Sequence, residues 1–387
     1  MFDYNLVYLA VWGLAFISIL VRNLKVDYLY VMQISILTLF LALKFETGYD
    51  WPVYEAHFFN VSAGESFNLN FEIGYELLVH MFSAMGFKFH QFIAIVSILE
   101  VILVAAAVRF FFPNYRLWVM AIIFAIPDFY LIPYFSLVRQ GLAASLFFYG
   151  VRYYAENKRF LSWLIFGLAV SLHYSVVGAL ILFSLAFKIK LSKNVFLTLF
   201  ALSVFFYLSS IDVVRSFVEQ IVVYLDPKYM IYLDRDVYNA SMLYRGVYAC
   251  VSAIIFALIY MSWRRQDFES SDPKLSPSIH RLAMFGILIP LVVYGFPTFS
   301  TRYQFFFCIF TVGISFTSLA RFNARDRFAV LMVTCFLAYI PFYRFLSNPL
   351  SIVYIPYQSQ IFFDKSNSTG QQRTDDLLNQ LDVLWSK

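Results

Sequence analysis

Five short stretches of this 387-residue chain place ionisable and aromatic side chains together in patterns that could support acid-base or phosphate chemistry. The first runs from Lys44 to Glu55 and holds acids, aromatic rings and a glycine. Asp50 could act as a general base or bind sugar hydroxyls, while Trp51 and Tyr54 could stack on pyranose rings. The same composition also fits an aromatic belt at a membrane interface with solvated charges.

A pair of carboxylates forms the second stretch. Glu72 and Glu76 are four residues apart, so within one helix they would share a face. Carboxylates this close could split their pKa values and supply one acid and one base. The alternative is a solvated helix start, where negative charge suits the helix dipole.

Arginines stand at the outer starts of two predicted transmembrane helices. Arg139, followed by Gln140, begins one of them and Arg302 begins the other. A fixed positive charge beside the positive end of a helix dipole favours phosphate, so these two arginines could hold one diphosphate bidentately from two sides. Arg245 and Arg344 are weaker candidates of the same kind. Snorkelling to lipid headgroups is the alternative role.

Two further ionisable residues fall within apolar surroundings. His173 can exchange a proton near neutral pH, which lysine, arginine and an ordinary carboxylate do not. The alternative is that His173 is a structural residue held by hydrogen bonds, as a lone histidine often is. Glu100 lies midway along a predicted span, where a structural pairing between helices fits it best.

The composition places these stretches in a membrane protein. The chain is 61% hydrophobic and 14% charged, and its mean hydropathy is +0.70, so it carries more apolar surface than a soluble fold of this length buries. Its apolar runs approach the roughly 20 residues that span a bilayer, and they do not alternate as barrel strands do. We therefore predict an all-α, polytopic bundle of transmembrane helices.

The distribution of charge predicts about twelve spans. The run from Phe160 to Phe187 could form one tilted helix or two short helices that meet near His173. Only two crossings keep Lys188 and Lys190 on the cytoplasmic side with the other short basic loops. This choice brings His173 to the outer face. The predicted spans are 6–21, 28–43, 91–108, 117–133, 138–154, 160–187 crossed twice, 195–208, 247–261, 282–297, 303–319 and 328–345.

The longest connections are extracytoplasmic in this topology. They comprise residues 44–88 and 211–245, and function should lie on their side of the membrane. Within them, periodic apolar residues predict amphipathic helices that lie at the interface. These helices are expected at 52–60, 71–85 and 211–225.

The expected domain organisation is simple. Residues 1–347 should form a single transmembrane domain, and residues 348–387 an extracytoplasmic tail. Thr374 and the acids after it would cap a short amphipathic helix in that tail.

The sequence lacks the motifs of nucleotide-driven and metal-dependent enzymes. It contains no Walker A motif, dinucleotide fingerprint, zinc-protease helix or calcium loop, and its five histidines are scattered. Cys250, Cys308 and Cys335 lie in apolar runs at spacings that match neither a disulfide framework nor a zinc site. Basic residues lie mostly in loops, where they set orientation. We therefore expect no metal, no cofactor and no nucleic-acid partner. The residue types on the outer face fit a sugar donor linked to a lipid diphosphate.

The order of the motifs resembles the EpsG-type branch of the Wzy polysaccharide polymerases over residues 40–345. That family carries Arg-x-x-x-Gly-x-Asp-aromatic-x-x-Tyr, Glu-x-Gly-Tyr, Arg-Gln-x-x-Ala, Leu-Ala-x-x-x-His-x-Ser and a late Arg with aromatic residues. Lys44 stands where the family usually has arginine, so bidentate phosphate binding is not expected there. The matching residues are Gly48, Asp50, Trp51, Tyr54, Glu72, Gly74, Tyr75, Arg139, Gln140, Ala143, Leu168, Ala169, His173, Ser175, Arg302 and Tyr303.

The resemblance implies a membrane glycosyltransferase with a GT-C-like fold in the bacterial inner membrane. Such an enzyme would polymerise undecaprenyl-diphosphate-linked repeat units into O-antigen or exopolysaccharide on the periplasmic face, without a metal or cofactor. Its partners would be the lipid-linked donor and acceptor, membrane lipids, and a flippase and chain-length regulator of the same pathway.

The resemblance also assigns roles, with inversion at the anomeric carbon expected from a single displacement. His173 is the preferred base. The assigned residues are His173, Asp50 and Glu72 for catalysis, Arg139, Arg302 and Arg245 for the diphosphate, and Trp51, Tyr54, Tyr75 and Gln140 for the glycan.

Two other functions use similar residues. A flippase or other transporter of lipid-linked oligosaccharide needs basic cavity residues but no outer histidine or carboxylates for chemistry. An O-antigen ligase shares the donor and the leaving group and differs in its acceptor.

Overall fold

The computed structural model describes residues 2–20, 26–67, 71–216, 240–265, 273–361 and 369–385. Over these ranges every regular element is a helix, and an isolated bridge pairs Lys44 with Ser359. The predicted all-α class is therefore confirmed.

Four of the described helices are long and apolar enough to cross a membrane, judged by length and composition. Seven shorter apolar helices accompany them. These features are consistent with a helical membrane protein, while the count of twelve spans and the GT-C-like fold stay predictions. The four long segments are Asp3–Leu20, Phe89–Phe111, Met242–Arg265 and Arg325–Leu346.

The chain divides into two compact units. The first comprises Met1–Val176 and Phe322–Lys387, and the second comprises Val177–Arg321. The helices of the first unit are α1 (Phe2–Leu20), α2 (Val26–Ala42), α3 (Trp51–Ser62), α4 (Ile73–Ala84), α5 (Phe89–Phe111), α6 (Arg116–Ala125), α7 (Val138–Ala155), α8 (Arg159–Leu172), α17 (Ala324–Leu346) and α18 (Gly370–Trp385).

Buried polar side chains join the helices of the first unit. The amide of Gln33 on α2 donates to the carbonyl oxygens of Val11 on α1, at 3.1 Å, and Leu117 on α6, at 3.0 Å. The hydroxyl of Tyr8 on α1 donates to the carbonyl of Cys335 on α17, at 2.6 Å. Buried polar groups need such partners, so these bonds fix how the apolar helices pack.

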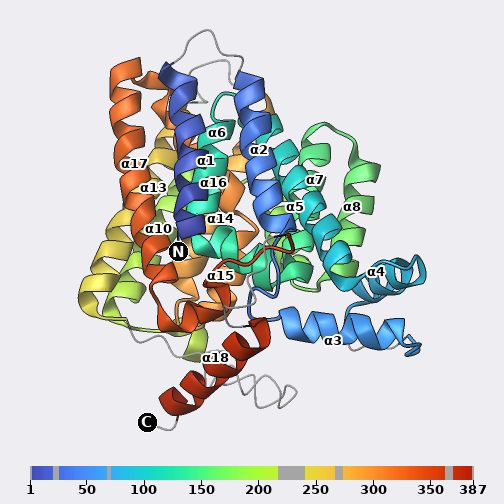
Figure 1. The fold of residues 1–387 in the computed structure, drawn as a ribbon. Coiled ribbons are helices and arrows are strands. Elements are labelled where there is room, and N and C mark those ends of the chain that lie inside the picture. The colour runs from blue at the N-terminus through green and yellow to red at the C-terminus, as the bar shows by residue number, and fades with distance from the viewer. Residues whose placement is uncertain are drawn as a thin grey trace. The chain divides into compact units, whose positions relative to one another are not determined.

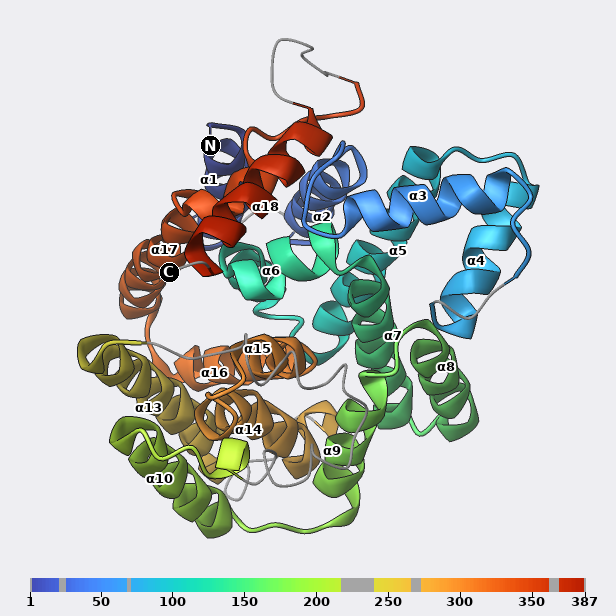
Figure 2. The same ribbon diagram turned by 90° about the horizontal axis from the view of Figure 1, so that it is seen from below.

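Helices are present at both positions predicted in the first connection, as α3 and α4, while their place at the membrane interface stays a prediction. Figure 1 shows α3 lying across the axes of α1 and α2, and Figure 2 shows it lengthwise while those two are seen nearly end-on. Of the helix predicted over 211–225, the structure describes only the beginning, where residues 213–216 are helical. The rest of that prediction lies outside the described residues.

The predicted span 117–133 is helical only as far as Ala125. A 3₁₀ turn, Pro127–Phe129, and a π turn, Ile132–Ser136, separate α6 from α7. Pro127 and Pro133 explain the break, because proline lacks the amide hydrogen that a continuing helix needs and restricts the residue before it.

The second unit is also helical. The predicted interruption near His173 is confirmed, because α8 ends at Leu172 and α9 begins at Val176. The predicted span 303–319 is divided instead of continuous. The helices of this unit are α9 (Val176–Lys188), α10 (Lys193–Ser209), α13 (Met242–Arg265), α14 (Pro277–Val292), α15 (Pro297–Phe305) and α16 (Cys308–Thr317).

The predicted tail helix is present as α18, and a buried arginine attaches it to the first unit. The Arg373 guanidinium is fully buried and donates to the carbonyl oxygens of Pro356 and Glu46, both at 2.7 Å. The Glu46 carboxylate in turn accepts from the Gly370 amide at 2.7 Å. The tail helix therefore holds the loop that leads into α3.

Replacing Arg373 by methionine should release α18. The change leaves two partly buried carbonyl oxygens without their donor, and losing charge-assisted bonds of this kind costs about 1.5–3 kcal/mol. We expect thermolysin to remove the tail roughly tenfold faster, as followed on gels with an N-terminal tag. Gln371→Ala, on the exposed face of the same helix turn, is the matched control. Equal cleavage of both variants would contradict the role given to Arg373.

Candidate active site

Three elements of the first unit bring a carboxylate, a guanidinium and an imidazole together. Glu72 lies immediately before α4, Arg139 lies in the first turn of α7, and His173 follows the end of α8. One Glu72 oxygen lies 2.5 Å from His173 Nδ1, and the other accepts from an Arg139 terminal nitrogen. Glu72 therefore joins an imidazole, which is suited to proton transfer, and a guanidinium, which is suited to binding phosphate.

The environment of Glu72 keeps it ionised. Its side chain is 7% exposed, against 20% for His173 and 22% for Arg139. Burial alone would raise the pKa of Glu72, but the hydrogen bond from His173 and the charge of Arg139 outweigh burial and lower the pKa to about 2. Glu72 is therefore an anchor for its two partners and a poor base near neutral pH.

Glu72 and Glu76 do not act as a carboxylate pair. The backbone of Glu72 is extended, with φ −66° and ψ 143°, so this residue lies before the helix and does not share the helical face of Glu76. Glu76 is fully buried, and its carboxylate lies 3.2 Å from His57 Nε2 and 3.9 Å from His80 Nε2. The contact of His57 with Glu76 could not be predicted from the sequence, because the two residues lie on different helices.

Aromatic rings surround the Arg139 guanidinium. Its carbon lies 4.6 Å from the ring centroid of Phe71, 5.7 Å from that of Tyr54 and 5.8 Å from that of Tyr75. Arg139 Nε also donates to the Tyr54 hydroxyl at 3.5 Å. Tyr54 and Tyr75 are buried here, so they support the arginine. Their predicted contacts with glycan stay predictions.

Close packing between α4 and α8 sets the distance from Glu72 to His173. A Cβ atom at Gly74 would lie 2.8 Å from the backbone carbonyl carbon and oxygen of Ser171. Real Cβ atoms do not approach backbone this closely, so only glycine allows this contact. This close contact is the steric reason for a glycine at position 74 in Glu72-x-Gly74-Tyr75.

Gly74→Ala should therefore weaken both the fold and the site. Overpacking of this kind costs about 1–3 kcal/mol, and here it also pushes Glu72 away from His173. We expect a lower unfolding temperature in detergent together with lower activity. Gly167→Ala on α8 is the control, because a Cβ there meets nothing within 4 Å and alanine favours helix. A stable, active Gly74→Ala variant would show that the contact does not set the site.

The loop before α3 is fixed by a second close approach. Gly48 has φ +108°, and a Cβ there would lie 2.6 Å from the carbonyl oxygen of Phe135. The next residue, Tyr49, donates its amide to the Ser136 hydroxyl at 2.9 Å. The loop thus rests against the π turn before α7. It leads directly to Asp50 at the start of α3.

Three other predicted residues lie in this part of the chain. Asp50 is half-buried, and its charge helps to raise the pKa of Tyr54 after the larger effect of burial. Trp51 is buried, and a Cβ at Gly370 of the tail helix would lie 2.8 Å from its ring. Gln140 is 2% exposed within α7. Their roles toward substrate stay predictions.

The two other predicted arginines lie in the second unit. Arg302 is on α15 and is partly exposed. Arg245 on α13 is buried, donates to the Ser210 hydroxyl and to the Tyr207 carbonyl at 3.4 Å, and lies over the Tyr294 ring at 5.5 Å. These contacts hold Arg245 in place, and its predicted binding of the diphosphate stays a prediction. A joint grip of one diphosphate by Arg139 and Arg302 stays a prediction.

A metal site does not emerge from the described part of the chain, where no three His, Cys, Asp or Glu side chains gather as ligands would. An anchored imidazole can move a proton, and a guanidinium can bind an anion.

Comparison with known proteins identifies the family. A sequence model of the EpsG family matches residues 27–359, which is most of the chain. No curated protein and no solved structure matches. With its long apolar helices, the chain therefore belongs to the EpsG family of membrane proteins of polysaccharide synthesis.

Proposed function

We propose that this protein is a glycosyltransferase that polymerises oligosaccharide repeat units carried on undecaprenyl diphosphate. The reaction would take place on the periplasmic face of the bacterial inner membrane and build O-antigen or exopolysaccharide. The observation that carries the proposal is the pairing of Glu72 with both His173 and Arg139. An imidazole and a guanidinium thus lie together, and the proposal makes the first the base and the second the anion-binding group.

His173 is the base in this mechanism. Its Nδ1 faces the ionised Glu72 carboxylate at 2.5 Å, so the Nδ1 proton is donated to Glu72 and Nε2 is left as the acceptor. Nε2 can then take the proton from the attacking hydroxyl of the acceptor sugar. Glu72 orients the ring and stabilises the imidazolium that forms.

Arg139 stabilises the leaving group. As the acceptor oxygen forms its bond to the anomeric carbon, the bond from that carbon to the diphosphate oxygen breaks. The electron pair leaves with undecaprenyl diphosphate, whose growing negative charge Arg139 meets in the transition state. One displacement inverts the anomeric centre. Arg302 is proposed to share the diphosphate, and Asp50 to orient the acceptor hydroxyl.

The remaining assignments concern the glycan and the pathway. Trp51, Tyr54, Tyr75 and Gln140 are proposed to line the path of the sugar chain. A flippase would deliver the lipid-linked repeat units, and a chain-length regulator would set when polymerisation stops.

Deleting the gene and viewing the surface polysaccharide on a gel tests the function. Loss of a polymerase should leave a single repeat unit in place of the ladder, whereas loss of a flippase or ligase should leave none. A ladder of unchanged length in the deletion strain would overturn the proposal.

A further inference from the structure

A groove lies between α2 and α5 in the first unit, away from Glu72 and His173. Its volume is about 830 Å³, and it opens on the outside of the helices. The wall on α2 includes Val31, Ile34 and Leu39, and the wall on α5 includes Ile102 and Ala106. Val31, Leu39 and Ile102 are each at least half exposed in the structure, so this is an apolar surface that faces the bilayer.

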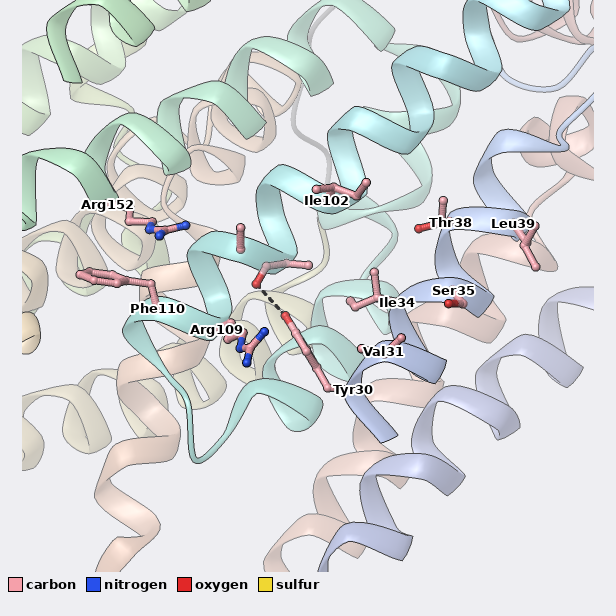
Figure 3. Close-up of a pocket in the computed structure, with 12 residues that line it drawn as sticks. Tyr30, Val31, Ile34, Ser35, Thr38, Leu39, Ile102, Arg109, Phe110 and Arg152 are labelled. Atoms are coloured by element: carbon pink, nitrogen blue, oxygen red, sulfur yellow. Dashed lines mark hydrogen bonds between the residues drawn. The ribbon is translucent and has the colours of Figure 1, made fainter. Parts of the chain in front are cut away.

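One end of the groove is basic. Arg109, at the end of α5, and Arg152, at the end of α7, both line it. Figure 3 shows both arginines on the side of the groove away from Thr38 and Leu39. The groove therefore combines a long apolar wall with two guanidinium groups at a single end.

The charges at this end do not cancel. The Asp27 carboxylate is shared by Arg109, at 3.0 Å, and Arg116, at 3.1 Å. The Glu156 carboxylate is shared by Arg152, at 3.0 Å, and Lys158, at 2.7 Å. Each carboxylate thus has two cationic partners, and positive charge remains in excess at the end of the groove.

This basic end is far from the proposed catalytic site. Arg152 lies on the same helix as Arg139 but thirteen residues later, which at 1.5 Å per residue is about 20 Å along the axis. That length is a large part of the roughly 30 Å hydrocarbon core. A diphosphate held at Arg139 therefore cannot also contact Arg152, and the groove needs a different occupant.

We propose that the groove binds an anionic phospholipid of the cytoplasmic leaflet. Its phosphate contacts Arg109 and Arg152, which can hold phosphate oxygens bidentately, and one acyl chain lies along α2 and α5. The short basic loops after α5 and α7 place this end on the cytoplasmic side. A lipid bound there supports the end of α7 opposite to the one that carries Arg139.

The test measures phosphatidylglycerol binding to the full chain in detergent by native mass spectrometry. In Arg109→Gln/Arg152→Gln we expect affinity to fall roughly tenfold, which corresponds to about 1.4 kcal/mol. Arg264→Gln/Arg265→Gln, at the end of α13, removes the same charge elsewhere and should change affinity less than twofold. If both double variants lose affinity equally, the effect is general charge and the site is wrong.

A third variant tests the acyl chain separately. Ala106→Trp fills the groove and leaves both arginines in place, so it should also weaken phosphatidylglycerol binding. Phosphatidylcholine should bind weakly to the unmodified protein, and free glycerol 3-phosphate should not displace phosphatidylglycerol. Full binding by Ala106→Trp, or displacement by glycerol 3-phosphate, would overturn the proposal. Polymer formation is not the readout, so failure here would leave the proposed glycosyltransferase function untouched.

Discussion

Replacing His173 by alanine is expected to lower the rate of polymerisation by about 10²–10⁴-fold, the contribution of a positioned general base. The variant loses the only group at this site that the mechanism uses to accept the hydroxyl proton. Because the imidazole is partly exposed and its contact with Glu72 is made through Nδ1, the fold should survive. The measurement is the rate of chain extension by purified protein with a lipid-linked repeat unit, beside the gel ladder in complemented cells.

His90→Gln provides the matched control for His173. His90 also lies near a glutamate, with its Nε2 3.7 Å from Glu55, but it is not part of the site. We expect His90→Gln to restore the ladder. If the His173→Ala protein inserts into the membrane normally and extends chains as fast as His90→Gln, His173 is not the base. The proposed polymerase function would not be contradicted by that result.

Glu72→Gln tests whether Glu72 is needed to orient the His173 imidazole, because the variant leaves the proposed base itself in place. The amide keeps the shape of the carboxylate but cannot hold the imidazole with a negative charge. In the unmodified protein the pKa of Glu72 is about 2, so its charge does not change between about pH 4 and 9. Any pH dependence of the rate in that interval must therefore come from another group. Glu72→Gln should lower the rate and alter the pH profile, whereas a merely structural role would leave the profile unchanged.

Much of the fold could be predicted from the sequence because its signals are local. The positions of Lys188 and Lys190 predicted the interruption between α8 and α9, and apolar periodicity predicted α3, α4 and α18. The division between α15 and α16 could not be predicted. It falls at Phe306 and Phe307, where an aromatic run without glycine or proline reads as one continuous apolar helix.

The site could be predicted in its residues but not in its pairing. Glu72, Arg139 and His173 each stood out by type and expected side. The bond between Glu72 and His173 joins residues that are 101 positions apart, and it depends on the contact of Gly74 with Ser171. A pattern within one helix cannot contain that information. Helical spacing even misplaced Glu72 beside Glu76, because the extended backbone of Glu72 is set by tertiary packing.

Replacing Arg139 by alanine should lower the rate about 10²–10³-fold, the range for losing one donor to a developing negative charge. The loss should appear in kcat as well as KM, because the diphosphate gains charge in the transition state. Arg139→Lys keeps the charge but not the fork of donors, so it should recover only part of the rate. Arg159→Gln, an exposed arginine at the start of α8, is the control for loss of charge.

Arg139 also changes the pKa of Glu72. Arg139 helps to lower the pKa of Glu72, so Arg139→Ala raises that pKa. The Glu72 carboxylate then takes up a proton at a higher pH, so the acidic limb of the pH–rate profile shifts to higher pH. A carboxylate with a lowered pKa stabilises the folded state above its unfolded pKa, and this stabilisation is lost as the pH falls toward 2. Arg139→Ala should therefore lose part of that stability, as thermal unfolding at neutral pH can measure.

Because Arg139 and Glu72 are in contact, the double variant Arg139→Ala/Glu72→Gln should lose less activity than the two single losses combined. Additive losses would show that Arg139 and Glu72 act independently, which the proposed site does not allow.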